Sequence, residues 1–147
     1  MKAISPVIAT VIIVAVAIAI SIAVALWLTG IVGGFTTVEN LQITYAYAEK
    51  KGDDGWEIKL RVENKGTGTA TIDEVFINNK PSSQITNATV KVGNDTFNPN
   101  VGSSIEPGRS IEMTITLPSG PFSSGQQVEV KLHTASGKEY PKMVTLP

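Results

Sequence analysis

Hydrophobic and polar positions divide the chain into two parts with different periodicities. From Val7 to Leu28 nearly every residue is apolar, and only Thr10 and Ser21 interrupt the run. At 1.5 Å per residue this run forms a helix about 33 Å long, enough to cross the hydrocarbon core of a bilayer. A lone strand is excluded there, because its backbone groups would lack partners in lipid. The pattern therefore predicts a transmembrane helix.

The apolar residues of this run surround the helix instead of forming one stripe. At about 100° per residue, its alanines spread over most of the circumference, and no GxxxG spacing marks a two-helix contact. Such a helix needs apolar neighbours on all sides. Lipid provides them, and so does a bundle of identical helices, so the sequence leaves both environments open.

Beyond Gly34 the pattern changes to a period of two residues. Trp56, Ile58, Leu60 and Val62 alternate with charged residues, as expected for a strand with one buried and one solvated face. Similar alternation predicts strands at residues 41–47, 111–117 and 128–132, and weaker patterns do so at 72–77, 85–92 and 142–146. About seven short strands separated by turn residues are typical of an immunoglobulin-like sandwich. The predicted fold class is α+β: a long N-terminal hydrophobic α-helix followed by an antiparallel immunoglobulin-like β-sandwich.

Glycines mark the joint between these two parts. Gly30, Gly33 and Gly34 follow the apolar run closely. Glycine ends helices readily and also permits bends. These three residues are therefore interpreted either as a hinge between helix and head or as a helix C-cap followed by a loop.

Composition excludes several classes of function. The chain has 12 lysines and arginines against 13 aspartates and glutamates, a net charge of −1, which argues against a basic surface for nucleic acid. It has no cysteine, so thiol catalysis, disulfides and cysteine-ligated metals are excluded. All the charge apart from Lys2 lies at or beyond Glu39, leaving Ala3 to Val38 uncharged.

No pattern of residues predicts catalysis. His133 is the sole histidine, and no GxSxG nucleophile elbow accompanies it, so we expect a surface or edge histidine. Asp53 and Asp54 lack the EF-hand spacing and are expected in a solvated turn. We therefore predict no enzyme, and assign no catalytic, cofactor-binding or metal-binding residue.

Two sequence features concern the surface of the polar part. Asn87-Ala88-Thr89 and Asn94-Asp95-Thr96 are acceptor sequons for glycosylation, although such triplets also occur by chance on neutral β domains. Three aromatic residues, Tyr45, Tyr47 and Trp56, occupy the apolar positions of predicted strands and are expected in the core.

The opening residues Met1 to Thr10, MKAISPVIAT, followed by the apolar run, resemble the start of archaeal type IV pilins. The resemblance implies that a membrane-embedded prepilin peptidase reads Lys2 and Ala3 and cuts so that Ile4 becomes the N-terminus. An ordinary signal peptide has a shorter apolar core. The implied organisation is a short leader at residues 1–3, a hydrophobic helix for membrane span and filament core at residues 4–34, and a β-sandwich head at residues 35–147.

The family implies a structural subunit of an extracellular pilus on the cell surface, held in the cell membrane before assembly. The subunits would form a homopolymer through their N-terminal helices, served by pilus assembly machinery, and the heads would adhere to surfaces or cells. No nucleic acid is expected as a partner, whereas surface glycans are. The residues expected to pack in the filament core are Val7, Ile8, Val11, Ile12, Val14, Ala15, Ala17, Ile18, Ala19, Ile22, Ala25 and Leu26.

Two alternatives remain open at this stage. An archaellum-type filament subunit would share the helix and the head. A membrane-anchored β-sandwich binding module that never polymerises would explain the apolar span equally well.

Overall fold

One long helix and one β-sandwich contain nearly all of the regular structure in this computed structural model, which describes residues 4–35, 37–53 and 55–147. The chain divides into two units, Met1–Thr37 and Val38–Pro147. We call the second unit the head. The N-terminal unit contains the helix α1 (Ile4–Phe35).

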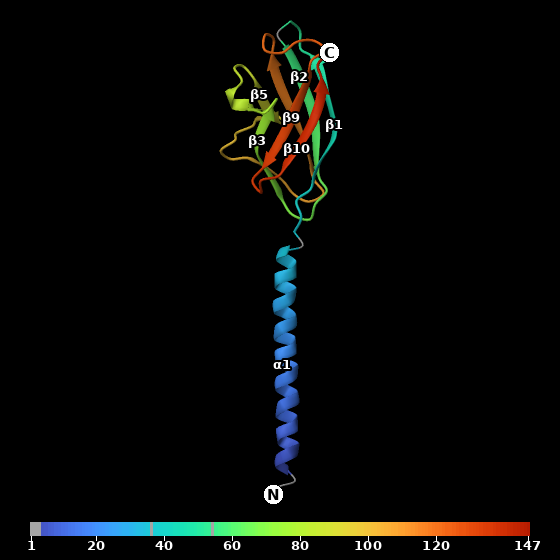
Figure 1. Cartoon of the computed structure of the whole chain (residues 1–147), viewed down its shortest axis with the longest axis vertical. Helices are drawn as coiled ribbons and strands as arrows, with labels where there is room; N and C mark the ends of the chain where they lie inside the picture. The colour runs from blue at the N-terminus through green and yellow to red at the C-terminus, as the bar shows by residue number, and fades with distance from the viewer. Residues whose placement is uncertain (1–3, 36, 54) are drawn as a thin grey trace. The chain divides into compact units, whose positions relative to one another are not determined.

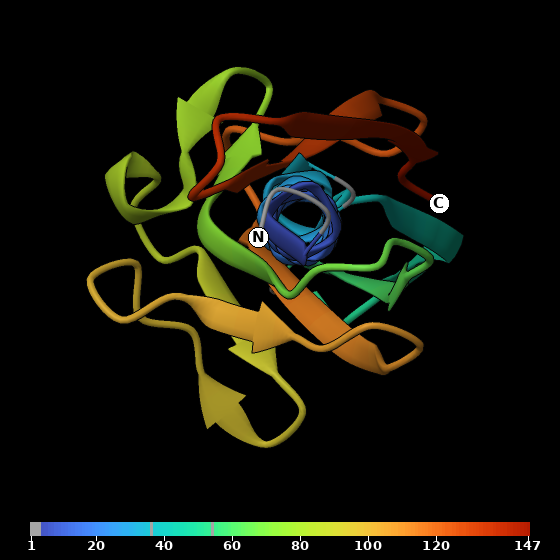
Figure 2. The same cartoon turned by 90° about the horizontal axis from the view of Figure 1, so that it is seen from below.

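Helix α1 is straight and continues past the first glycine of the joint. It is 32 residues long, and its turns overlie one another in the end-on view of Figure 2. Gly30 lies more than a turn before its end, so a C-cap at Gly30 is wrong. A glycine inside a helix costs about 1 kcal/mol, less than the loss of the backbone bonds that a break would cause. Gly33 and Gly34 lie in the last turn of α1, and a hinge at these residues stays a prediction.

The head consists of two antiparallel sheets, seen as the two layers of strands in Figure 1. The first sheet contains, in spatial order, β1 (Leu41–Lys50), β2 (Gly55–Asn64), β8 (Ser110–Pro118), β5 (Thr89–Val92) and β6 (Asp95–Thr96). The second contains β10 (Glu139–Thr145), β9 (Gln127–Thr134), β3 (Ala70–Ile77) and β4 (Lys80–Pro81), with β7 (Ser103–Ile105) also paired to β3. The short 3-10 helix η1 (Ser82–Gln84) follows β4.

The order of the strands is that of an immunoglobulin domain. Strands β1, β2, β8 and β5 occupy the places of strands A, B, E and D, while β3, β9 and β10 occupy those of C, F and G. The predicted fold class, a hydrophobic helix followed by an antiparallel immunoglobulin-like sandwich, is therefore confirmed.

The core of the head is complete in itself. Its buried side chains come from alternate positions of facing strands, as the period of two predicted. The most buried include Ile58, Leu60, Met113, Ile115, Leu117 and Leu132. All the hydrophobic residues of this core lie between Leu41 and Leu146. Because α1 contributes none of them, residues 38–147 have what they need to fold alone.

Two predicted strands differ in the structure. The strand expected at residues 85–92 begins only at Thr89, because Asn87 adopts a left-handed conformation (φ 63°) that interrupts an extended chain. In β1, the register with β2 shifts between Ile43 and Tyr45, so one extra residue, Thr44, is accommodated as a β-bulge. The residues after the bulge therefore face the opposite way from their predicted side.

That bulge reverses the expected burial of two tyrosines. Leu41 before it is buried, but after it Ala46 and Ala48 pack against the core. Tyr45 and Tyr47 lie on the outer face and are 37% and 44% exposed. The expectation of a core role was wrong for both, whereas Trp56, at 6% exposed, is a core residue as predicted.

A buried asparagine ties together the end of β2 and two loops. The Asn64 Nδ2 donates to the carbonyl oxygens of Gly68 and Ile105, each at 2.8 Å. Its Oδ1 accepts a bond from the Gly66 N–H at 2.9 Å. Asn64 is fully buried, so water cannot replace these partners.

We predict that Asn64→Ala lowers the free energy of unfolding of the head by about 2–4 kcal/mol, because buried polar groups lose their partners. Urea unfolding of residues 38–147, followed by circular dichroism, measures this change. Asn98→Ala is the matched control, since the exposed Asn98 Oδ1 accepts a similar bond from the Asn100 N–H. Equal losses in the two variants would contradict the role assigned to Asn64.

Candidate assembly surface

The side chains of α1 are exposed on every side from Ser5 to Gly30. Ile13 is 68% exposed and Leu26 is 70% exposed, while residues of the head core are nearly inaccessible. By length and composition, the segment Ser5–Ile31 can cross a membrane. All twelve residues expected to pack in a filament core lie on this helix, and each is exposed in the single chain. Full burial of one such large side chain is favourable by about 1.5–3 kcal/mol of free energy, so this surface is more stable when lipid or another apolar surface covers it.

Three of the four hydroxyl groups of α1, those of Thr10, Ser21 and Thr29, are bonded within the helix. The Thr10 Oγ1 donates to the carbonyl oxygen of Pro6 at 2.8 Å, and the Ser21 Oγ donates to that of Ala17 at 2.7 Å. Thr29 Oγ1 bonds its own helix in the same way. These three hydroxyl groups therefore need neither water nor a partner from outside the helix. The described surface of α1 can therefore pack against lipid or against other apolar helices.

The chain segment that enters the head is held firmly by it. We call residues 38–40 the connector. The Val38 N–H donates to the Thr67 Oγ1 at 2.9 Å, and the Val38 carbonyl accepts from the N–H groups of Thr67 and Gly68. The Asn40 carbonyl accepts from the Lys65 N–H at 2.8 Å.

The middle residue of the connector is bound on its other side. The Glu39 carboxylate accepts hydrogen bonds from the Ser136 hydroxyl at 2.7 Å and the Tyr140 hydroxyl at 3.1 Å. The Lys138 Nζ donates to the Glu39 carbonyl at 2.7 Å. Partial burial, assisted by the nearby Glu39, raises the pKa of Tyr140. Hydrogen bonds thus attach the chain to the head from Val38 onward, and the hinge predicted at the glycines would have to act before this residue.

The bulge of β1 creates an aromatic pair on the outer face of the first sheet. The rings of Tyr45 and Tyr47 lie 5.8 Å apart, and the Tyr45 hydroxyl donates to the Glu112 Oε1 at 3.0 Å. This bond raises the pKa of Tyr45. Lys59 pairs with Glu49 on the same face. Sequence reasoning missed this surface, because alternation alone carries no signal for an extra residue in a strand.

Both glycosylation sequons lie on exposed turns next to β5. Asn87 precedes the strand, and Asn94 follows Gly93 in the turn between β5 and β6. Both asparagines are exposed, as are the hydroxyl-bearing residues Thr89 and Thr96. A modifying enzyme would thus have access to either site, and modification remains a prediction.

His133 lies on a strand of the head, and Asp53 lies in a turn. His133 lies on β9, between β3 and β10, so it is not an edge residue. Its Nδ1 contacts the Asp73 carboxylate, and its ring meets Phe76 edge-on at 6.3 Å. These contacts join β9 to β3 across the second sheet. Asp53 is exposed in a turn, and within the described ranges no three potential metal ligands cluster.

The processing residues fall at the border of the described structure. Ile4 is the first residue of α1. Lys2 and Ala3, as well as Asp54, lie outside the described residues.

No protein-family model and no curated protein matches the chain. Among solved structures, the archaellum periplasmic stator protein FlaG from Sulfolobus acidocaldarius is 20% identical with a TM-score of 0.44, covering 72% of this chain and 99% of that one. The archaeal flagellum of Methanospirillum hungatei strain JF1 is 20% identical with a TM-score of 0.49, covering 99% and 92%. The apo PCuAC domain from PmoF1 is 12% identical with a TM-score of 0.46, covering 75% and 98%.

The solved structures that match this chain thus have quite different descriptions. A fold does not by itself define a function, which is carried by particular residues. Function therefore has to be derived from the residues of the chain itself.

We predict that protein isolated from its native cells carries glycan on at least one sequon and is heavier than its polypeptide. Asn87→Gln and Asn94→Gln, alone and together, should remove the added mass. Thr89→Ser is the matched control, since it keeps an acceptor sequon and should keep the glycan. Intact-mass spectrometry measures each step, and a native mass equal to that of the bare polypeptide would contradict glycosylation.

Proposed function

We propose that this protein is a structural subunit of an extracellular archaeal type IV pilus that polymerises through α1. One observation carries the proposal: α1 is apolar on all sides and has no charged residue along its whole length. The opening sequence, which resembles archaeal type IV pilins, supports the same assignment.

The two states of such a subunit follow from the surface of α1. Before assembly, lipid surrounds the helix and the cell membrane holds the subunit. During assembly, neighbouring α1 helices replace the lipid, and the filament core buries the apolar surface that water would otherwise contact. One unpaired charge in this core would recur in every subunit at high cost. The uncharged stretch from Ala3 to Val38 meets that requirement.

The head supplies what the helix cannot. It has its own core, so it stays folded whether α1 lies in a membrane or in a filament. In the filament, the heads would form the outer surface and adhere to surfaces or cells. Prepilin peptidase would remove residues 1–3, and a secretion ATPase and membrane platform would drive assembly, as the family resemblance implies.

Electron microscopy of filaments sheared from native cells tests the proposal, with mass spectrometry to identify the subunit. We expect thin helical filaments built from this chain, with a polypeptide that begins at Ile4. If the chain stays in the membrane and no filament contains it, the anchored binding module replaces the pilin assignment.

The helix α1 would serve a pilus and an archaellum equally well, so the two functions are distinguished by the phenotype of a deletion strain. Loss of attachment to surfaces or cells with swimming intact supports the adhesive pilus. Loss of swimming with attachment intact supports the archaellum-type filament.

We predict that Ala17→Asp abolishes filaments while leaving the head folded, because it introduces a charge into the filament core, where the α1 helices pack together. Ala17→Ser is the matched control. Its hydroxyl can bond the preceding turn, as the Ser21 hydroxyl does at 2.7 Å, so filaments should persist. Filament yield is counted by electron microscopy in cells that express each variant. Normal filaments from Ala17→Asp would contradict close packing of helices around this position.

A further inference from the structure

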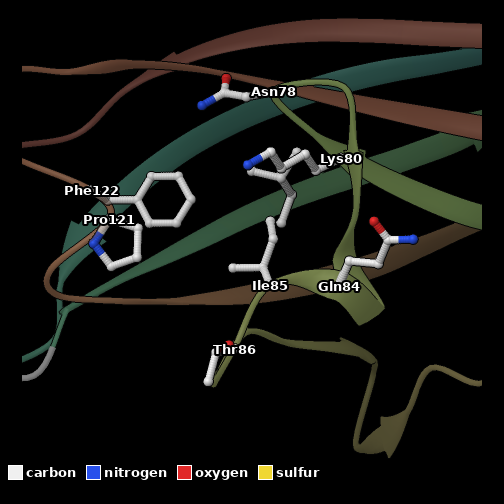
Figure 3. A pocket seen from close by; sticks show the side chains of 8 residues that line it. Asn78, Lys80, Gln84, Ile85, Thr86, Pro121 and Phe122 are labelled. Atoms are coloured by element: carbon white, nitrogen blue, oxygen red, sulfur yellow. The ribbon is translucent and has the colours of Figure 1, made fainter.

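The head contains an apolar pocket of about 310 Å³ beside the short edge strand β4. Its walls come from Ile77 at the end of β3, Ile85 after η1, and Pro121 and Phe122 in the loop between β8 and β9. Figure 3 shows Ile85, Pro121 and Phe122 around a common space. Ile77 and Phe122 are themselves core residues, so the inner wall of the pocket is part of the rigid sandwich.

Polar groups stand only around the rim of this pocket. Asn78, Lys80, Gln84 and Thr86 complete its lining. In Figure 3 the Lys80 side chain extends over the pocket with its ammonium group directed toward Phe122. This combination of apolar walls with a few polar groups at the mouth is typical of sites for small molecules.

In the described part of the head, Lys80 has no partner, whereas four of the nine lysines form ion pairs. Lys51, Lys59, Lys65 and Lys131 each pair with a glutamate. Within the described part of the chain, no carboxylate or other acceptor lies within bonding distance of the Lys80 Nζ. None of the eight lining residues is acidic. The pocket therefore presents one unneutralised positive charge beside an apolar cavity.

We propose that this pocket binds a small aromatic anion, with a body of about two rings and one carboxylate or sulfonate group. The volume sets the size, because a cavity of about 150 Å³ holds one benzene ring. The walls from Ile77, Ile85 and Phe122 would take the rings. The charge at Lys80 selects an anion over a neutral or cationic molecule of the same shape. The site lies wholly in the head, so it is independent of polymerisation through α1.

The test uses two fluorescent probes that differ by one group. Naphthalene-2-sulfonate has two fused rings with a sulfonate group, and naphthalene has the same rings without it. Both are titrated into residues 38–147, because the apolar helix would bind either probe non-specifically. We expect saturable binding of one sulfonate probe per head, tighter than that of the neutral probe.

Three variants locate the site and the charge. Lys80→Gln should lower the affinity of the head for the sulfonate probe about three- to tenfold and leave its affinity for the neutral probe unchanged. Lys91→Gln, which removes an exposed lysine on β5 that does not line the pocket, is the matched control and should change neither. Ile85→Ala should lower the affinity for both probes, because it removes part of the apolar wall that both would contact. Circular dichroism confirms that each variant is folded.

Any of three results would overturn the proposal. One is the absence of saturable binding by the sulfonate probe to the folded head. Another is an equal response of the two probes to Lys80→Gln, which would mean that the charge selects nothing. NMR shifts of the sulfonate complex should concentrate at Ile77, Ile85 and Phe122, and shifts confined to another face would also refute this site.

Discussion

The apolar surface of α1 is unfavourable in water, and the organisation of this chain depends on keeping that surface covered. Every side of the helix is apolar, and the hydroxyl groups of Thr10, Ser21 and Thr29 bond its own carbonyl oxygens. No single partner covers such a surface, so only an enclosing environment suffices. Lipid and a bundle of like helices both enclose it, and the proposed pilus uses one after the other. The absence of charge between Ala3 and Val38 is a condition for both.

The separate core of the head follows from the same constraint. A helix that changes its surroundings cannot also contribute side chains to a fixed core, and the core of the head takes none from it. The connector is bound to the head at Val38, Glu39 and Asn40, so the fixed structure of the sandwich begins at Val38, shortly after the end of α1 in the sequence. Its outer surfaces, including the Tyr45–Tyr47 pair and the pocket beside β4, are then available for contacts unrelated to assembly.

Sequence patterns predicted those parts of the fold in which neighbouring residues share one simple environment. The span from Val7 to Leu28 is uniformly apolar, and Trp56 to Val62 alternates without interruption, so both were recognised correctly. The pattern failed where one residue changed the geometry. Thr44 is accommodated in a bulge and turns Tyr45 outward, and Asn87 delays the start of β5. Glycine often ends helices, but α1 continues through Gly30.

The sequence by itself determined the division into an uncharged helix and a period-two β domain, because hydrophobic period and charge are properties of the chain alone. It also marked the opening that resembles pilins and the two sequons. Only the tertiary structure decided which side of β1 faces solvent, since a bulge is defined against the partner strand. It alone assembled the pocket, because Ile77, Ile85 and Phe122 are far apart along the chain and meet only when the strands and loops that carry them pack together.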